Sequence, residues 1–289
     1  ESRAATGEDG SFAIPVDPLR AAGRTLLARS PDGQTLGLFK YDWDLTPDRV
    51  ETPVRVVLKP GREFSAIVLS PPGVGIADAQ VEVAGDDILL AHAVTAPGGL
   101  ARFFLPIDGR VKNVIAWSPK DGFGSAPMGP IVASRDFSGI KVKDLPTSVY
   151  VKLTETRPAR IKAIDPLGEP VAGVTFYPVV VFDRGVELLG SATRSRMLTR
   201  ATGPDGIATF EWLPRSKGAT TFFPAPDDRY VHRRVEVPAE AKGAVEFTAT
   251  PPVPLRGRVT LPDGSPAKAV LVRAVGSGRG PDQGGGTTL

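Results

Sequence analysis

Few residues of this chain could perform acid–base, nucleophilic or metal chemistry, and they are scattered. Cysteine is absent, which removes thiolate nucleophiles, cysteine metal ligands and disulfides. The only two histidines, His92 and His232, stand far apart in the sequence. The sequence contains neither a His-Glu-x-x-His zinc motif nor a Gly-x-Ser-x-Gly nucleophile turn. We therefore expect no enzyme activity and no bound cofactor.

Two groupings of side chains could still hold a metal ion. Tyr230 and His232 lie two apart on a predicted strand and share a face, but an iron site needs further ligands and this segment supplies one histidine. Carboxylates at turns, which calcium also uses, occur at Asp9, Asp42, Asp44 and Asp205. Calcium takes six or more oxygens, whereas a single Asp before Gly is typical of a turn. The turn interpretation is favoured, and no metal is predicted.

A covalent cross-link between a lysine and another side chain is a further possibility. Asn113 is the only asparagine, so a Lys–Asn isopeptide bond repeated along the chain is excluded. A Lys–Asp cross-link stays open.

Exposed aromatic rings could stack on sugar rings, and the chain has three tryptophans. Trp212 lies on the apolar face of an alternating strand and is predicted to be in a core. Trp43 stands in an acidic, turn-rich segment. Trp117 aligns with Arg29 and Ala225 in other copies of a repeat described below, so its position is not reserved for a core residue. Trp117 and Trp43 are the candidate carbohydrate-binding residues, with packing as the alternative.

The composition predicts many short strands. The 32 Gly and 29 Pro stand between short apolar runs, which indicates frequent turns. The net charge is +3, and Lys and Arg form no run longer than Arg233-Arg234, so we expect no nucleic-acid partner. No apolar stretch reaches 18 residues, so no membrane span is predicted.

An internal repeat of about 95 residues organises these elements. Residues 58–83 form a strand, a Pro/Gly turn and a second strand, and the same order begins again at Leu153. In this alignment Gly73 corresponds to Gly168, and Gly168 to Gly264.

A second landmark recurs independently of the first. A threonine stands four residues before a glycine, and an aromatic residue and then a proline follow. The three copies begin at Thr6, Thr95 and Thr202. We interpret each as a hairpin turn in which glycine supplies the positive φ.

The remaining landmarks complete a seven-stranded unit. Short apolar runs ended by Pro and Asp begin at Thr25, Val114 and Thr220, and an alternating closing strand follows at residues 54–58, 149–153 and 245–249. Seven strands in about 95 residues suit a two-sheet sandwich. The second full copy carries an insertion near residues 183–197, which is expected to extend a hairpin or loop.

The fold class predicted is therefore all-β, with tandem seven-stranded Greek-key β-sandwich domains. Residues 1–59 hold the C-terminal part of one repeat, 60–155 and 156–251 are complete sandwiches, and 252–289 begin another. The first residue is Glu and no signal peptide is visible, which fits an N-terminus that is truncated within a longer protein.

The turn signatures resemble the carboxypeptidase regulatory-like domain, which has a transthyretin-like (prealbumin-like) β-sandwich. The resemblance is carried by residues 165–173 (DPLGEPVAG) and 202–210 (TGPDGIATF), and in part by residues 261–267 and 6–12. Residues 70–78 depart from it, because they lack the Pro-Val pair. The resemblance implies a non-catalytic module of an exported or surface-anchored bacterial protein and also suggests starch-binding-like folds.

Two functions are consistent with these observations. The first is a spacer or docking stalk in an extracytoplasmic (periplasmic, cell-surface or secreted) protein, because each repeat uses its apolar faces for its own core and Pro60 and Pro158 stiffen the boundaries. The alternative is a carbohydrate-binding module that uses exposed aromatic residues. The partner expected is a protein or a polysaccharide at the cell surface.

Overall fold

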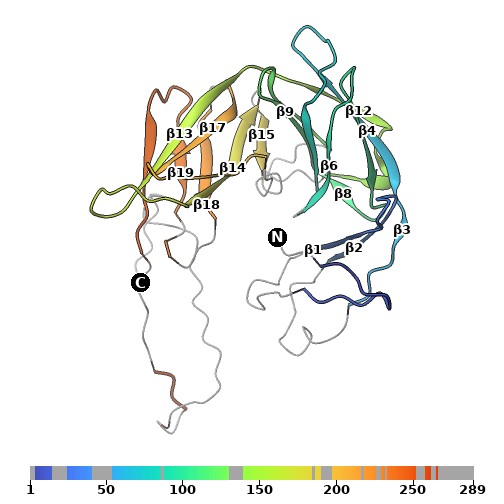
Figure 1. Ribbon diagram of the computed structural model, residues 1–289, viewed down its shortest axis with the longest axis horizontal. Helices are drawn as coiled ribbons and strands as arrows, with labels where there is room; N and C mark the ends of the chain where they lie inside the picture. Colours follow the sequence, from blue (N-terminus) through green and yellow to red (C-terminus); the bar gives the residue numbers. More distant parts are fainter. Residues whose placement is uncertain are drawn as a thin grey trace. The chain divides into compact units, whose positions relative to one another are not determined.

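The computed structural model describes residues 4–14, 25–40, 54–85, 88–129, 139–183, 186–189, 197–215, 218–225, 229–231, 233–251, 258–261 and 265. The chain forms two compact units, Glu1–Pro251 and Pro252–Leu289. The described part of the first unit consists of strands, turns and one three-residue 3-10 helix, η2 (Val142–Asp144) (Figure 1). Among the described residues, no helix has the length and apolarity required to cross a membrane.

The strands between Arg62 and Lys152 form a sandwich of two sheets. One sheet has the order β12-β4-β7 and the other β10-β9-β5-β6. The seven strands are β4 (Arg62–Leu69), β5 (Gln80–Ala84), β6 (Leu89–Val94), β7 (Leu100–Leu105), β9 (Asn113–Ser118), β10 (Gly122–Pro127) and β12 (Ser148–Lys152). The short strands β8 (Arg110–Val111) and β11 (Ile140–Lys141) pair with each other. The chain crosses between the sheets after β4, β6, β7 and β10, which confirms the predicted seven-stranded sandwich.

The strands between Thr156 and Thr248 repeat this order. One sheet is β17-β13-β20, and the other is β15-β14-β18-β19 with β16 also paired to β14. The strands are β13 (Thr156–Ile164), β14 (Thr175–Asp183), β15 (Val186–Leu189), β16 (Arg200–Ala201), β17 (Ile207–Pro214), β18 (Thr220–Pro224), β19 (Val235–Val237) and β20 (Ala244–Thr248). The insertion begins as the hairpin β14–β15, as predicted.

The N-terminal segment adds a three-stranded sheet, β1-β2-β3, made of β1 (Thr25–Arg29), β2 (Thr35–Lys40) and β3 (Lys59–Pro60). The predicted closing strand at residues 54–58 is wrong for this copy. These residues keep the alternation, with Val54 and Val56 half-buried, but they form no strand and Leu58 is exposed. No described strand pairs with them, so they lack the ladder that the corresponding residues of the full repeats have.

Each sandwich contains its own hydrophobic cluster. The first includes the fully buried Phe64, Ala66 and Val68 of β4. The second includes Phe210 and Trp212 of β17, which confirms the predicted core placement of Trp212. In both cases the alternate residues of the strand enter the cluster, as a half-buried strand requires.

The turn threonine of the second sandwich is a buried cross-brace. The Thr202 hydroxyl donates to the Val171 carbonyl (2.7 Å) and accepts from the Val174 amide (2.9 Å). The turn that follows lies against the end of β13, because the Ala163 amide donates to the Gly206 carbonyl at 2.8 Å. A Cβ on Gly206 would lie 2.6 Å from the Ala163 oxygen, so this position requires glycine.

The first sandwich has the same brace. The Thr95 hydroxyl donates to the Ile76 carbonyl (2.6 Å) and accepts from the Ala79 amide (2.9 Å). In the N-terminal copy the turn itself is formed, with Gly10 at φ +76°, but Thr6 is exposed. The two full repeats therefore encode a buried hydrogen-bonded brace as well as a turn. The predicted hairpin is wrong, because the turn leads from β6 to β7 and from β16 to β17, which lie in different sheets of their sandwich.

Candidate functional site: the joint between repeats

The two sandwiches share an aromatic contact at the linker between them. Phe123 lies on β10 of the first sandwich, yet it is fully buried in the hydrophobic cluster of the second. Its ring centroid is 5.5 Å from that of Trp212. Phe123 also pairs with the linker, since its amide donates to the Thr154 carbonyl (3.0 Å) and its carbonyl accepts from the Thr154 amide (2.8 Å). The linker residue Thr154 is thus hydrogen-bonded to Phe123 of the first sandwich, and the Phe123 side chain packs in the core of the second.

A similar arrangement occurs one repeat earlier, although the apolar residue there is not a member of the next sandwich's hydrophobic cluster. Leu36 on β2 pairs with Lys59, as Phe123 pairs with Thr154. Leu36 is also buried, with an exposed fraction of 1%. A Cβ on Gly61 would lie 2.5 Å from a Leu36 methyl group, so Leu36 packs directly against the chain that enters β4. The joint is therefore a repeated feature of the chain.

Glycines at matched positions allow these close contacts. A Cβ on Gly124 would lie 2.5 Å from the Lys152 carbonyl oxygen, and a Cβ on Gly37 would lie 2.5 Å from the Val57 carbonyl oxygen. Separations under about 3 Å do not occur between real atoms of this kind, and no side chain fits at either position. Each glycine stands one residue after the apolar residue of its joint.

Trp117 faces the following repeat. It is half-buried, it packs against the second cluster, and the Arg200 guanidinium lies 5.8 Å from its ring centroid, at cation–π distance. At the aligned position one repeat earlier, the Arg29 guanidinium donates to the Leu90 carbonyl at 2.9 Å. Both residues therefore contact the next repeat. A carbohydrate-binding role for Trp117 stays a prediction, and Trp43 lies outside the described residues.

Sequence reasoning missed a second repeated contact, made by an arginine at the start of the first strand of each sandwich. Arg62 donates to the Val142 and Leu145 carbonyls, and Arg157 donates to the Pro238 carbonyl at 2.9 Å. Burial lowers the pKa of Arg157 from its ordinary value. The two arginines stand 95 residues apart, the period of the repeat, and that spacing was the available signal. We refer to Arg62 and Arg157 as the strand anchors.

The residues considered for metal binding serve other roles where the structure describes them. Asp9 accepts the amide of Ser11 (2.9 Å), and Asp205 accepts the amide of Ile207 (3.0 Å), as in a turn. The hydrogen bonds from Ser11 lower the pKa of Asp9. The described residues bring no three metal-ligating side chains together. His232, Asp42 and Asp44 lie outside the described residues.

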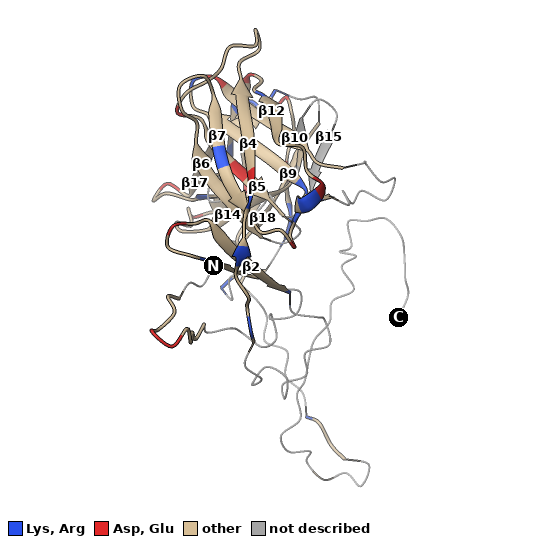
Figure 2. Ribbon diagram, turned by 90° about the vertical axis from the view of Figure 1, so that its right-hand side faces the viewer, with Lys and Arg blue, Asp and Glu red and all other residues tan. Residues whose placement is uncertain are grey.

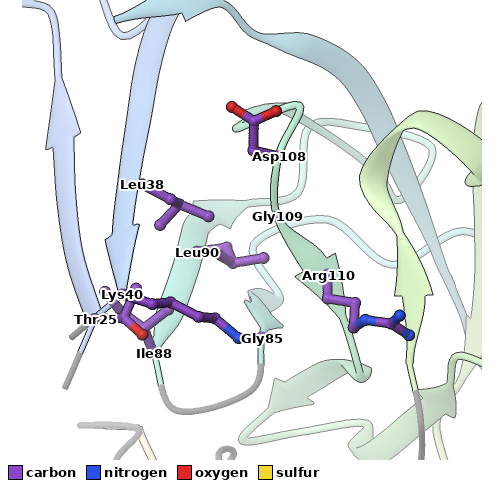
Figure 3. Close-up of a pocket in the computed structure, with 9 residues that line it drawn as sticks. All are labelled: Thr25, Leu38, Lys40, Gly85, Ile88, Leu90, Asp108, Gly109 and Arg110. Carbon is purple, nitrogen blue, oxygen red and sulfur yellow. The ribbon is translucent and has the colours of Figure 1, made fainter. Parts of the chain in front are cut away.

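Two cavities in the described part are small. One, of about 250 Å³, lies beside Tyr230, whose ring carries the Arg229 guanidinium 5.3 Å from its centroid. The other, of about 30 Å³, lies between the N-terminal sheet and the first sandwich, where Leu38 and Leu90 point inward (Figure 3). Ligand pockets usually have about 300–1,000 Å³. Both cavities are below this range.

Charged side chains are interspersed over the described strands. Figure 2 shows Lys/Arg and Asp/Glu positions mixed with long uncharged stretches. One close Lys–Asp contact joins the N-terminal sheet to the first sandwich, with Lys59 Nζ 2.7 Å from Asp108 Oδ2. Both side chains are about half exposed, so this pair contributes little to stability.

Comparisons of the whole chain with known proteins give distant structural matches. No family model matches the sequence, and no curated protein shows a significant match. Among solved structures, the shaft pilin SpaA from Lactobacillus rhamnosus GG is 10% identical with a TM-score of 0.29, covering 68% of this chain and 100% of that one. A streptococcal ancillary pilin is 12% identical with a TM-score of 0.25, covering 75% and 71%. The Bacillus anthracis TIE protein is 16% identical with a TM-score of 0.24, covering 78% and 41%. TM-scores this low do not establish a shared topology.

Proposed function

We propose that this chain is a non-catalytic spacer in which consecutive β-sandwiches are held by a repeated joint that restricts bending. The observation that carries the proposal is the burial of Phe123 in the core of the next sandwich, together with the matching burial of Leu36 one repeat earlier. A flexible tether would leave both residues exposed to water. Fully burying a side chain of this kind contributes about 1.5–3 kcal/mol, which is enough to favour the closed joint strongly.

The linker supports the same proposal. Thr154 is hydrogen-bonded to Phe123 on one side, and the Arg215 amide donates to the Glu155 carbonyl (3.0 Å) on the other. Backbone groups that are paired in this way cannot rotate freely without losing both contacts. Residues 60–155 and 156–251 are therefore proposed as two domains joined by a short, fixed connection.

Spin labelling tests the proposal directly, because the chain has no native cysteine. Labels at Arg102→Cys and Glu246→Cys occupy exposed positions on β7 and β20, one in each sandwich. We expect a narrow distribution of distances between the two labels in electron–electron double resonance. Replacing Phe123 with Ser is expected to broaden the distribution, since it removes the aromatic contact with Trp212.

The matched control is Phe103→Ser, which removes an aromatic ring from the core of the first sandwich but leaves the joint intact. It should lower stability without broadening the distance distribution of the folded protein. A broad distribution in the unmodified chain, or no broadening with Phe123→Ser, would contradict the proposal.

The location proposed for this spacer is outside the cytoplasm, namely periplasmic, cell-surface or secreted. The support for it is the resemblance of residues 165–173 and 202–210 to modules of exported proteins. The carbohydrate-binding alternative is not favoured by the contacts of Trp117, since one side of its ring is covered by Arg200. Retention of the full chain on immobilised polysaccharides, lost with Trp117→Ala, would favour that alternative instead.

A further inference from the structure

The first and last strands of each sandwich are neighbours and run parallel. In the first sandwich β12 pairs with β4 in parallel register, from Ser148 opposite Ser65 to Lys152 opposite Leu69. In the second sandwich β20 pairs with β13 in the same way. The other ladders within the two sandwiches are antiparallel in the described residues.

This arrangement determines how tension along the chain reaches the fold. The chain enters a sandwich at the start of β4 and leaves it at the end of β12, and these two points lie at opposite ends of the parallel ladder. Pulling them apart slides one strand along the other. All the hydrogen bonds of the ladder then carry the force together, whereas force applied at one end of a ladder would break them one at a time.

Hydrogen bonds outside the strand ends lengthen the first ladder. The Ser65 amide donates to the Thr147 carbonyl (3.0 Å), and the Leu153 amide donates to the Leu69 carbonyl (2.8 Å). Val151 and Leu153 are also fully buried in the cluster below, so sliding β12 would drag apolar side chains through a packed core.

The second sandwich has the equivalent contacts. The Ala249 amide donates to the Ile164 carbonyl at 2.7 Å, and Phe247 and Ala249 are buried. The strand anchor Arg157 ties the start of β13 to the Pro238 carbonyl, in the segment that leads into β20. The first strand of this sandwich, β13, is therefore also tied to the segment that precedes its last strand, β20.

We propose that each sandwich is a tension-resisting module, in which the parallel ladder between its first and last strands bears mechanical force along the chain. This inference rests on the proposed spacer function, because only a chain held at both ends carries tension. The proposal also implies that the spacer is attached at each end to a partner, and that these two partners are pulled apart.

Single-molecule pulling along two axes through the same sandwich tests the proposal, with the full chain and introduced cysteines as handles. The sliding axis uses Glu155→Cys and Thr250→Cys, which lie before β13 and after β20. The peeling axis uses Glu155→Cys and Lys242→Cys, which lie at the same end of the two parallel strands. All three positions are exposed, and no core residue is changed.

We expect the sandwich to unfold at a clearly higher force along the sliding axis than along the peeling axis, at equal pulling speed. Equal forces, or a higher force along the peeling axis, would overturn the proposal. Urea unfolding of the two unloaded variants serves as the control and should give the same midpoint. The outcome is independent of the spin-label experiment, because a flexible joint would leave the ratio of the two forces unchanged.

Discussion

The turn threonine has two structural roles, and the sequence spacing reveals one of them. Its spacing from glycine predicts a hairpin turn. A turn is present in all three copies, but in the two sandwiches it joins strands of different sheets and closes no hairpin. Its hydroxyl performs a second role that the spacing does not reveal, because it bridges two backbone groups from a segment 16 to 31 residues earlier. Thr95 and Thr202, which have this role, are buried, whereas Thr6 is exposed.

Replacing Thr202 with Val is expected to lower the free energy of unfolding of the second sandwich by about 1–3 kcal/mol. Valine has nearly the same shape, but it leaves the Val174 amide and the Val171 carbonyl without their partner. Urea unfolding measures the loss, and Thr95→Val should give a similar loss in the first sandwich. Thr6→Val is the matched control, since the same motif is exposed there. An equal effect at Thr6 would show that the turn alone, and not the brace, determines the cost.

At the scale of elements, period-two patterning was sufficient to predict the fold class. Phe210 and Trp212 alternate with polar or less buried neighbours, and burial of one face follows from that alternation. The pattern failed at residues 54–58, because alternation states which face is apolar but does not supply a neighbouring strand. The burial of the residues at the joint was not predicted, for a related reason. Phe123 and Leu36 stand on strands whose outward faces should be solvated, and only the next repeat makes them buried.

The strand anchors make an element-level prediction. Arg157→Met keeps the length and most of the apolar surface of the side chain but removes its hydrogen bond to the Pro238 carbonyl. We expect a loss of about 1.5–3 kcal/mol in the free energy of unfolding, the range for hydrogen bonds made by charged groups. Arg62→Met should give a comparable or larger loss, because Arg62 donates to two carbonyls.

The matched control for the anchors is Arg160→Met, on the same strand β13 and exposed. It should change the stability by little, because surface substitutions of this kind usually have small effects. Thermal unfolding of the three variants provides the measurement. If Arg160→Met costs as much as Arg157→Met, the cost reflects the loss of a positive charge on β13 and not the anchoring contact.

At the scale of the whole molecule, the repeat favours sandwiches that fold independently, whereas the joint couples them. Each sandwich has its own cluster and its own parallel ladder, which favours independent folding of residues 60–155 and 156–251. The second cluster nevertheless includes Ile115 and Phe123 from the first sandwich. Trp212 is fully buried partly because Phe123 lies against it, so the second sandwich is completed by its neighbour.

This overlap predicts one-sided coupling between the sandwiches. Residues 156–251 expressed alone should fold, but with a free energy of unfolding lower by about 1.5–3 kcal/mol than in the full chain, since the surface covered by Phe123 becomes exposed. Hydrogen exchange of the β17 amides measures the difference, and Phe123→Ala in the full chain should reproduce most of it. Residues 60–155 alone should lose less, because every fully buried member of their cluster lies within the segment and the half-buried Leu38 is the residue that packs against it from outside in the described part. Identical β17 protection in the isolated segment and in the full chain would mean that the joint closes without stabilising either sandwich, and the bending restriction attributed to Phe123 would then lack its energetic basis.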